Sequence, residues 1–163
     1  MMRHRTMLHA LLAVLAIALP ATARAPDSQY ERYDSDAVEI KDRETSLVWD
    51  RKSVIKQPTP AIAQGYCDRT VFPASNGRVP TVKELLTLVD EDPHIEYDSS
   101  FKPPNVQKYI DQNAFAETKT PIDTPYWTST PGPNPGDFWT VDFRTGKTAI
   151  RSTPTPLYVR CVR

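Results

Sequence analysis

The residues with the clearest capacity for chemistry are three cations near the end of the chain, Arg144, Lys147 and Arg151, which surround a turn sequence R-T-G-K. Guanidinium and ammonium groups pair with sulfate or carboxylate groups through charge-assisted hydrogen bonds. The three residues are therefore predicted to bind an anionic ligand. A solvated turn without a ligand accounts for the same residues and remains the simpler alternative.

The two cysteines of the chain, Cys67 and Cys161, offer three kinds of chemistry. A zinc site lacks further ligands, since His94 is the only histidine after the N-terminal leader. A reactive thiol pair is usually close in sequence, as in C-x-x-C, and these two are far apart. A structural disulfide is therefore predicted, because an even count of cysteines in an oxidising compartment favours one.

Other sites of chemistry find little support. The segment 90–98 carries five acids and His94, but its spacing is not that of an EF-hand, so a solvated, proline-broken loop is predicted. The sequence lacks the G-x-S-x-G and H-E-x-x-H motifs. Paired carboxylates of the glycosidase type stay open, because their spacing is spatial. We predict that the protein is not an enzyme and uses no cofactor.

Trp127 and Trp139 could stack on a sugar, although their apolar neighbours favour positions in the core for both side chains.

The N-terminus indicates export. Arg3 and Arg5 precede an uncharged run over 7–19, Pro20 follows, and Ala21-Thr22-Ala23 resembles a cleavage site. This order is typical of a signal peptide, so residues 1–23 are predicted to be removed, with a cut after Ala25 as a variant and a retained anchor as the alternative. The mature chain is then expected in the periplasm or outside the cell, without a membrane span.

The charge balance excludes one class of partner. After the leader, 18 basic residues face 20 acidic ones. So neutral a chain is not expected to bind nucleic acid. Fifteen of the 16 prolines lie beyond the leader, which predicts many turns, edges and irregular loops. The sequence does not predict an oligomeric state.

The elements that position these residues follow from periodicity. Residues 24–36 are polar and without a period, which predicts a flexible leader before one domain over 37–163. The stretch 38–49 reads as a hairpin around a turn at 42–46. Thr59 and Pro60 then start a helix whose inner face holds Ile62, Ala63, Tyr66 and Cys67. A second helix begins at Thr81 with a capping box to Glu84 and buries Val82, Leu85, Leu86 and Val89.

The C-terminal half is predicted to be mainly β-structure. Residues 101–125 read as a long irregular excursion with Tyr109, Ile110 and Phe115 as apolar anchors. Strand-like runs follow at 126–130, 138–143 and 148–150, and a last one at 157–162 holds Cys161. Because helices and strands are segregated along the chain, the fold class is predicted as α+β.

Several of these segments together resemble the Lcl C-terminal domain family, the C-terminal domains of bacterial collagen-like adhesins. The matching pieces, in order, are TSLVW (45–49), Cys67, GRVPTVKEL (77–85), YWTST (126–130), WTVDFRTG (139–146) and YVRCVR (158–163). Three positions depart from the family pattern. Ser46 replaces a turn glycine, Gly77 stands in place of a tryptophan, and Val79 stands in place of a leucine.

The resemblance implies a C-type-lectin-like fold, with two helices packed on small antiparallel sheets and many loops. It also implies a bridge from the early helix to the last strand, which agrees with Cys67 and Cys161. The calcium-dependent sugar-binding signature of C-type lectins is absent, and no collagen-like repeat precedes the domain.

Together these observations predict an exported, non-enzymatic binding module for anionic or sulfated glycans at the cell envelope or surface. Two alternatives stay open. The first is a periplasmic structural or protein-interaction domain that binds an envelope protein and no sugar. The second is an enzyme whose site the sequence does not reveal.

Overall fold

The computed structural model describes residues 26, 28–32, 38–52, 55–73, 75–97, 99, 102, 104–115, 118 and 124–163. The predicted signal peptide and most of the predicted leader lie outside these residues. No helix in the described part of the chain is long and apolar enough to cross a membrane.

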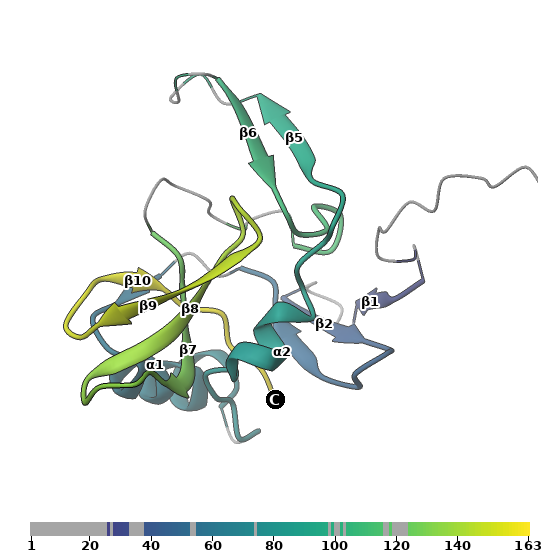
Figure 1. Cartoon of the computed structure of the whole chain (residues 1–163). Helices are drawn as coiled ribbons and strands as arrows, with labels where there is room; N and C mark the ends of the chain where they lie inside the picture. Colours follow the sequence, from purple (N-terminus) through teal and green to yellow (C-terminus); the bar gives the residue numbers. More distant parts are fainter. Residues whose placement is uncertain are drawn as a thin grey trace, which may run out of the picture.

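The described residues form two short α-helices, one π-helix and three sheets, which confirms the α+β class (Figure 1). The helices are α1 (Pro60–Tyr66), the π-helix η1 (Cys67–Val71) and α2 (Val82–Leu86). The first sheet has the order β1 (Tyr30–Arg32), β2 (Glu39–Asp42), β3 (Val48–Asp50). The second has the order β4 (Lys56–Gln57), β10 (Leu157–Tyr158), β7 (Tyr126–Pro131), β8 (Asp137–Asp142), β9 (Lys147–Ser152). The third pairs β5 (His94–Tyr97) with β6 (Asn105–Lys108).

The five-stranded sheet separates two clusters of core residues. Tyr126 and Trp127 are consecutive on β7, so their side chains point to opposite faces of the sheet. Tyr126 belongs to the cluster that contains Leu85 of α2, and Trp127 belongs to the cluster that contains Ala63 of α1. The sheet is therefore covered by α2 on one face and by α1 on the other.

Helix α1 starts as predicted. The Thr59 side chain accepts a hydrogen bond from the backbone N–H of Ile62 at 3.1 Å, and Pro60 occupies the first turn. Ala63 and Cys67 are fully buried, one turn apart. Ile62 is 53% exposed, so the prediction that it faces the core is wrong. The buried face that α1 and the start of η1 share is narrow and contains Ala63 and Cys67. Ile62 lies outside this face.

Helix α2 confirms the predicted capping box: Glu84 N–H donates to the Thr81 hydroxyl, and Thr81 N–H donates to the Glu84 carboxylate. Leu85 is fully buried, whereas Leu86 is 37% exposed and was wrongly predicted to be buried. The helix is only five residues long, and Leu88, beyond its end, occupies the next buried position.

Two turns of the molecule are built alike. In the β2–β3 turn, the Asp42 carboxylate accepts hydrogen bonds from Glu44 N–H and the Thr45 hydroxyl, and Ser46 has a φ of 62°. In the β8–β9 turn, Asp142 accepts the same two bonds from Arg144 and Thr145, and Gly146 has a φ of 67°. Both hairpins were predicted, and their pairing is antiparallel.

The structure differs from the sequence-based expectation at 90–125. His94–Tyr97 form strand β5 instead of a loop, and Asn105–Lys108 form strand β6 within the stretch predicted to be irregular. All four β5 residues are exposed, so no buried stripe marked the strand in the sequence. The hairpin projects from the rest of the molecule (Figure 1). The anchors Ile110 and Phe115 are buried as predicted.

Most of residues 157–163 are buried, and the segment is largely irregular. Only Leu157 and Tyr158 form a strand, so the predicted run over 157–162 is too long. Beyond it, Val162 bridges both Trp49 and Arg78, and Asp50 N–H donates to the Cys161 carbonyl. These partners lie in different parts of the fold, so the segment bends between them instead of continuing one ladder. The predicted disulfide joins Cys67 to Cys161 and is confirmed.

The stretch predicted as a flexible leader contains β1, which pairs antiparallel with β2. Tyr30 of this strand packs edge-on against Phe115, with ring centroids 5.1 Å apart. The sequence did not predict this strand, because one aromatic residue among polar neighbours has no period.

Candidate functional site

The predicted cation site lies at the free edge of the five-stranded sheet, since β9 is the last strand in the sheet order. Lys147 and Arg151 both belong to β9 and are four residues apart, so their side chains project from the same face. Their Cα atoms are separated by about 13 Å at the rise of a β-strand. Lys147 is exposed and Arg151 is half-buried.

Arg144 does not extend this row. It lies in the turn between β8 and β9, its side chain is half-buried, and it already has interaction partners. The turn itself is fixed to the body of the protein, because Tyr109 N–H donates to the Phe143 carbonyl at 2.7 Å. A Cβ added to Gly146 would lie 3.3 Å from the Tyr109 ring. The structure thus brings together two of the three predicted residues.

Acidic groups limit the positive field at this edge. Asp142 is the cross-strand neighbour of Lys147 and lies on the same face. Its carboxylate accepts the hydrogen bonds of the β8–β9 turn described above, so Asp142 also stabilises that turn. Asp137 faces the other way, opposite Ser152, whose hydroxyl donates to it at 2.6 Å. This hydrogen bond, followed by one from Asn134, lowers the pKa of Asp137. The row is therefore a local pair of cations with one acid at its Lys147 end.

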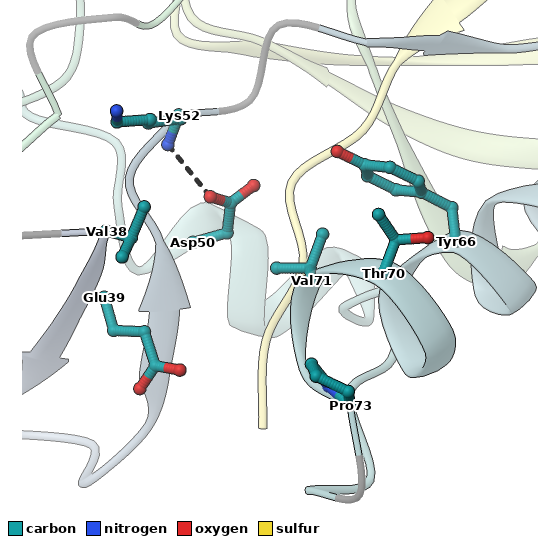
Figure 2. A pocket seen from close by; sticks show the side chains of 8 residues that line it. All are labelled: Val38, Glu39, Asp50, Lys52, Tyr66, Thr70, Val71 and Pro73. Atoms are coloured by element: carbon teal, nitrogen blue, oxygen red, sulfur yellow. Dashed lines mark hydrogen bonds between the residues drawn. The ribbon is translucent and has the colours of Figure 1, made fainter. Parts of the chain in front are cut away.

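A second candidate site is a pocket of about 510 Å³ between the β2–β3 hairpin and η1 (Figure 2). Figure 2 shows Asp50 at its centre, Glu39 of β2 on one side and Val71 of η1 on the other. The full lining is Val38, Glu39, Asp50, Lys52, Tyr66, Thr70, Val71 and Pro73. Such a mixture of apolar walls and a few polar groups is typical of small-molecule sites.

The charged groups that line the pocket are two acids, Glu39 and Asp50, and one base, Lys52. Asp50 is 7% exposed, and its carboxylate accepts a hydrogen bond from Lys52 N–H at 2.9 Å. Glu39 accepts a hydrogen bond from the Arg163 guanidinium at 2.7 Å. Burial, and then the negative charge of Asp50, raise the pKa of the Tyr66 hydroxyl. With two carboxylates and one ammonium group, the lining offers an anionic ligand less positive charge than the β9 edge does.

Sequence reasoning did not find the pocket, because its walls come from segments that are distant in the chain. The one local signal is Asp50, an acid at the end of an otherwise apolar strand, and hairpin ends commonly carry acids on the surface. Nothing in the sequence indicated that η1 would cover this position.

Arg160 contacts the backbone of Asp50 and is fully buried. Its guanidinium donates to the Asp50 carbonyl and, at 2.7 Å, to the Thr118 hydroxyl, and it lies 4.7 Å from the Phe115 ring centroid. Burial is the largest influence on Arg160 and lowers the pKa of its guanidinium. The arginine in the closing YVRCVR sequence therefore joins the last segment to β3 and is not available to a ligand.

The two tryptophans considered for sugar stacking differ in position. Trp127 is fully buried and donates its indole N–H to the Gln57 carbonyl at 2.9 Å, so it is a core residue. Trp139 is half-buried on β8.

Among the residues that the structure describes, no group of three or more His, Cys, Asp or Glu side chains is placed to hold a metal ion.

Comparison with known proteins gives one match. The model of the Lcl C-terminal domain family matches residues 38–163, which is most of the chain and includes both cysteines and both candidate sites. No curated protein matches the chain.

Proposed function

Because the chain belongs to the Lcl C-terminal domain family and is an adhesin-like C-terminal module, we propose that it is a non-enzymatic module that binds anionic glycans at the edge strand β9. The observation that supports this choice is the projection of Lys147 and Arg151 from one face of a free edge. The pocket beside Asp50 has two carboxylates and one ammonium group in its lining, so it is less suited to sulfate groups than the two cations of β9.

The expected binding is weak at a single site. Exposed ion pairs contribute roughly 0.2–1 kcal/mol each, and salt screens charges over about 10 Å at 0.1 M. A long sulfated chain that engages several copies of the module would gain from multivalency. Strong dependence on ionic strength is therefore the signature of this function.

Retention of the protein on a heparin column tests the proposal. Lys147→Ser/Arg151→Ser should elute at a clearly lower salt concentration than wild type, without a change in melting temperature. Arg69→Ser/Lys83→Ser is the matched control, because it removes the same charge from two exposed residues outside β9. Arg144→Ser is measured separately, since Arg144 lies in the turn before β9 and already has interaction partners. Wild type that flows through at low salt, or a control pair that loses as much retention, would contradict the proposal.

A specific surface favours the second candidate function, the binding of an envelope protein. On the β5–β6 hairpin, Ile95 is 61% and Tyr97 is 71% exposed, and both project from the same face. Their cross-strand neighbours Gln107 and Asn105 are exposed as well. A photo-crosslinker at position 97 should then give one defined protein adduct in cells, while the same group at Ser129, an exposed position on β7, should not. Equal labelling from both positions would argue against this function.

The proposal extends to the fold and the location. A C-type-lectin-like architecture is supported by the bridge between the early helix and the final segment. The disulfide is also consistent with an exported domain, because such bonds persist in oxidising compartments. N-terminal sequencing of protein recovered from the periplasm or the medium should begin just after Ala23 or Ala25. An intact Met1 would contradict cleavage.

A further inference from the structure

The segment between η1 and Arg78 exposes an asparagine that directly precedes a glycine. Asn76 is exposed and has a φ of 57°, and Gly77 follows it. Among the described residues, neither the Asn76 carboxamide nor the Gly77 N–H makes a hydrogen bond. An electrophilic side-chain carbonyl and an adjacent backbone nitrogen are thus both without a partner that would hold them apart.

We propose that Asn76–Gly77 is a site of spontaneous covalent self-modification in this protein. The Gly77 nitrogen, after losing its proton, attacks the Asn76 side-chain carbonyl carbon. A C–N bond forms, the bond to the side-chain nitrogen breaks, and ammonia leaves with the proton, which gives a five-membered succinimide. Water then adds to either ring carbonyl and opens the ring to aspartate or isoaspartate. No oxidant, enzyme or cofactor is required, and glycine presents no side chain to hinder the attack.

The other asparagines among the described residues lack this arrangement. Asn105 precedes Val106, and Asn113 precedes Ala114, whose side chains crowd the attacking nitrogen. Ala114 N–H is also held by the Asp111 carboxylate at 3.1 Å. Asn134 precedes Pro135, which has no N–H. These three positions are internal controls in the same molecule.

The two products have different consequences for the fold. Both add one negative charge, but only isoaspartate lengthens the main chain, by one carbon between residues 76 and 77. Gly77 has little room to absorb that carbon, because it is closely packed: a Cβ added there would lie 2.3 Å from the Cys67 carbonyl oxygen. Its own carbonyl also accepts a hydrogen bond from the Gln64 side chain. Arg78 is held by two backbone hydrogen bonds to Val162. The isoaspartate form should therefore strain this junction, and the aspartate form should not.

Incubation of the disulfide-bonded protein at neutral and at mildly alkaline pH, followed by peptide mapping, tests the inference. The peptide with Asn76 should gain one mass unit and accept methyl groups from an isoaspartyl methyltransferase, faster at the higher pH. The peptides with Asn105, Asn113 and Asn134 should not change over the same time. Modification at Asn76 no faster than at Asn113 would overturn the proposal.

Two variants separate the chemistry from its consequence. Asn76→Gln lengthens the side chain, disfavours the five-membered ring and should remain unmodified. Asn76→Asp supplies the aspartate product directly and should melt like fresh wild type. The isoaspartate fraction, isolated by ion exchange, should melt at a lower temperature than Asn76→Asp. An isoaspartate fraction as stable as Asn76→Asp would overturn the inferred strain at Gly77.

Discussion

At the scale of single residues, Ser46 and Gly146 occupy equivalent places in two turns with the same hydrogen bonds. Both have φ in the left-handed region, at 62° and 67°. An L-residue pays roughly 1–2 kcal/mol for this conformation, while glycine does not. Ser46 is therefore a position of backbone strain.

Ser46→Gly should stabilise the protein. Relief of the strain contributes roughly 1–2 kcal/mol, whereas the greater freedom of glycine in the unfolded chain costs about 0.5–1 kcal/mol, so a net gain of up to about 1.5 kcal/mol is expected. Ser46→Ala keeps the Cβ and serves as the control, with little change. Urea unfolding of the three proteins measures the difference. A less stable Ser46→Gly would show that the turn is held by something other than glycine-like geometry.

Glu84 makes the stability depend on pH. The bidentate hydrogen bonds from Arg78, and then those from Thr81, lower the pKa of Glu84 from 4.5 to about 2. Because the pKa is lower in the folded state, this contribution is present above pH 4.5 and is lost as the pH falls towards 2. Glu84→Gln should therefore destabilise the protein above pH 4.5, and the difference from wild type should shrink in acid.

Thermal melts across this range measure the effect, with Glu91→Gln as the control at an exposed acid. The ion pair is partly open to solvent, so the difference should also decrease at high salt. A difference between wild type and Glu84→Gln that does not vary with pH would rule out the pKa shift as its source.

At the scale of elements, α2 offers a matched pair of leucines. Leu85 is fully buried against the sheet, and Leu86 is 37% exposed. Leu85→Ala should cost about 2–5 kcal/mol of unfolding free energy, while Leu86→Ala should cost less than about 1 kcal/mol. Denaturant unfolding of the two variants compares the same change at adjacent positions. Similar losses would mean that α2 is rotated from its observed orientation.

These elements also mark how far the sequence could be read. Local signals such as Thr59, Pro60 and the Thr81–Glu84 box placed the helix starts correctly, because capping is decided within a few residues. The buried residues of α2 could not all be predicted, because a helix of five residues is too short for the helical repeat of apolar residues to be followed. The strand β5 was missed because none of its residues is buried.

The candidate site shows the same limit. Lys147 and Arg151 could be placed together from their spacing on one strand, whereas the half-buried setting of Arg144 depends on contacts of the turn with Tyr109. The pocket beside Asp50 could not be predicted, since it forms only when η1 packs against β3. Tertiary contacts, not local patterns, decide both outcomes.

At the scale of the whole molecule, the disulfide holds the final segment in place. Cys67 and Cys161 are 94 positions apart, and the bridge restricts a long loop of the unfolded chain. Cys67→Ala/Cys161→Ala should therefore lose about 2–5 kcal/mol of stability. Hydrogen exchange should also accelerate at the amides of Val48 and Asp50, which donate to residues 163 and 161.

Non-reducing peptide mapping gives the direct check of the bridge, with the two cysteine peptides expected as one linked species. Free thiols at both positions would contradict it. A double variant that unfolds with the same free energy as wild type would show that the hydrogen bonds of residues 161–163 suffice to hold the segment.

The central place of the final segment has a consequence for the order of events during synthesis. Arg160 supports Asp50, 110 positions earlier, and Val162 completes the backbone pairing of both Trp49 and Arg78. The β2–β3 hairpin therefore lacks the backbone partners of β3 until residues 161–163 have been synthesised. Folding of this domain cannot proceed from one end to the other, and contacts so distant in sequence make it slow. Any process that delivers the chain from its N-terminus would therefore leave this hairpin incomplete until residues 161–163 have emerged.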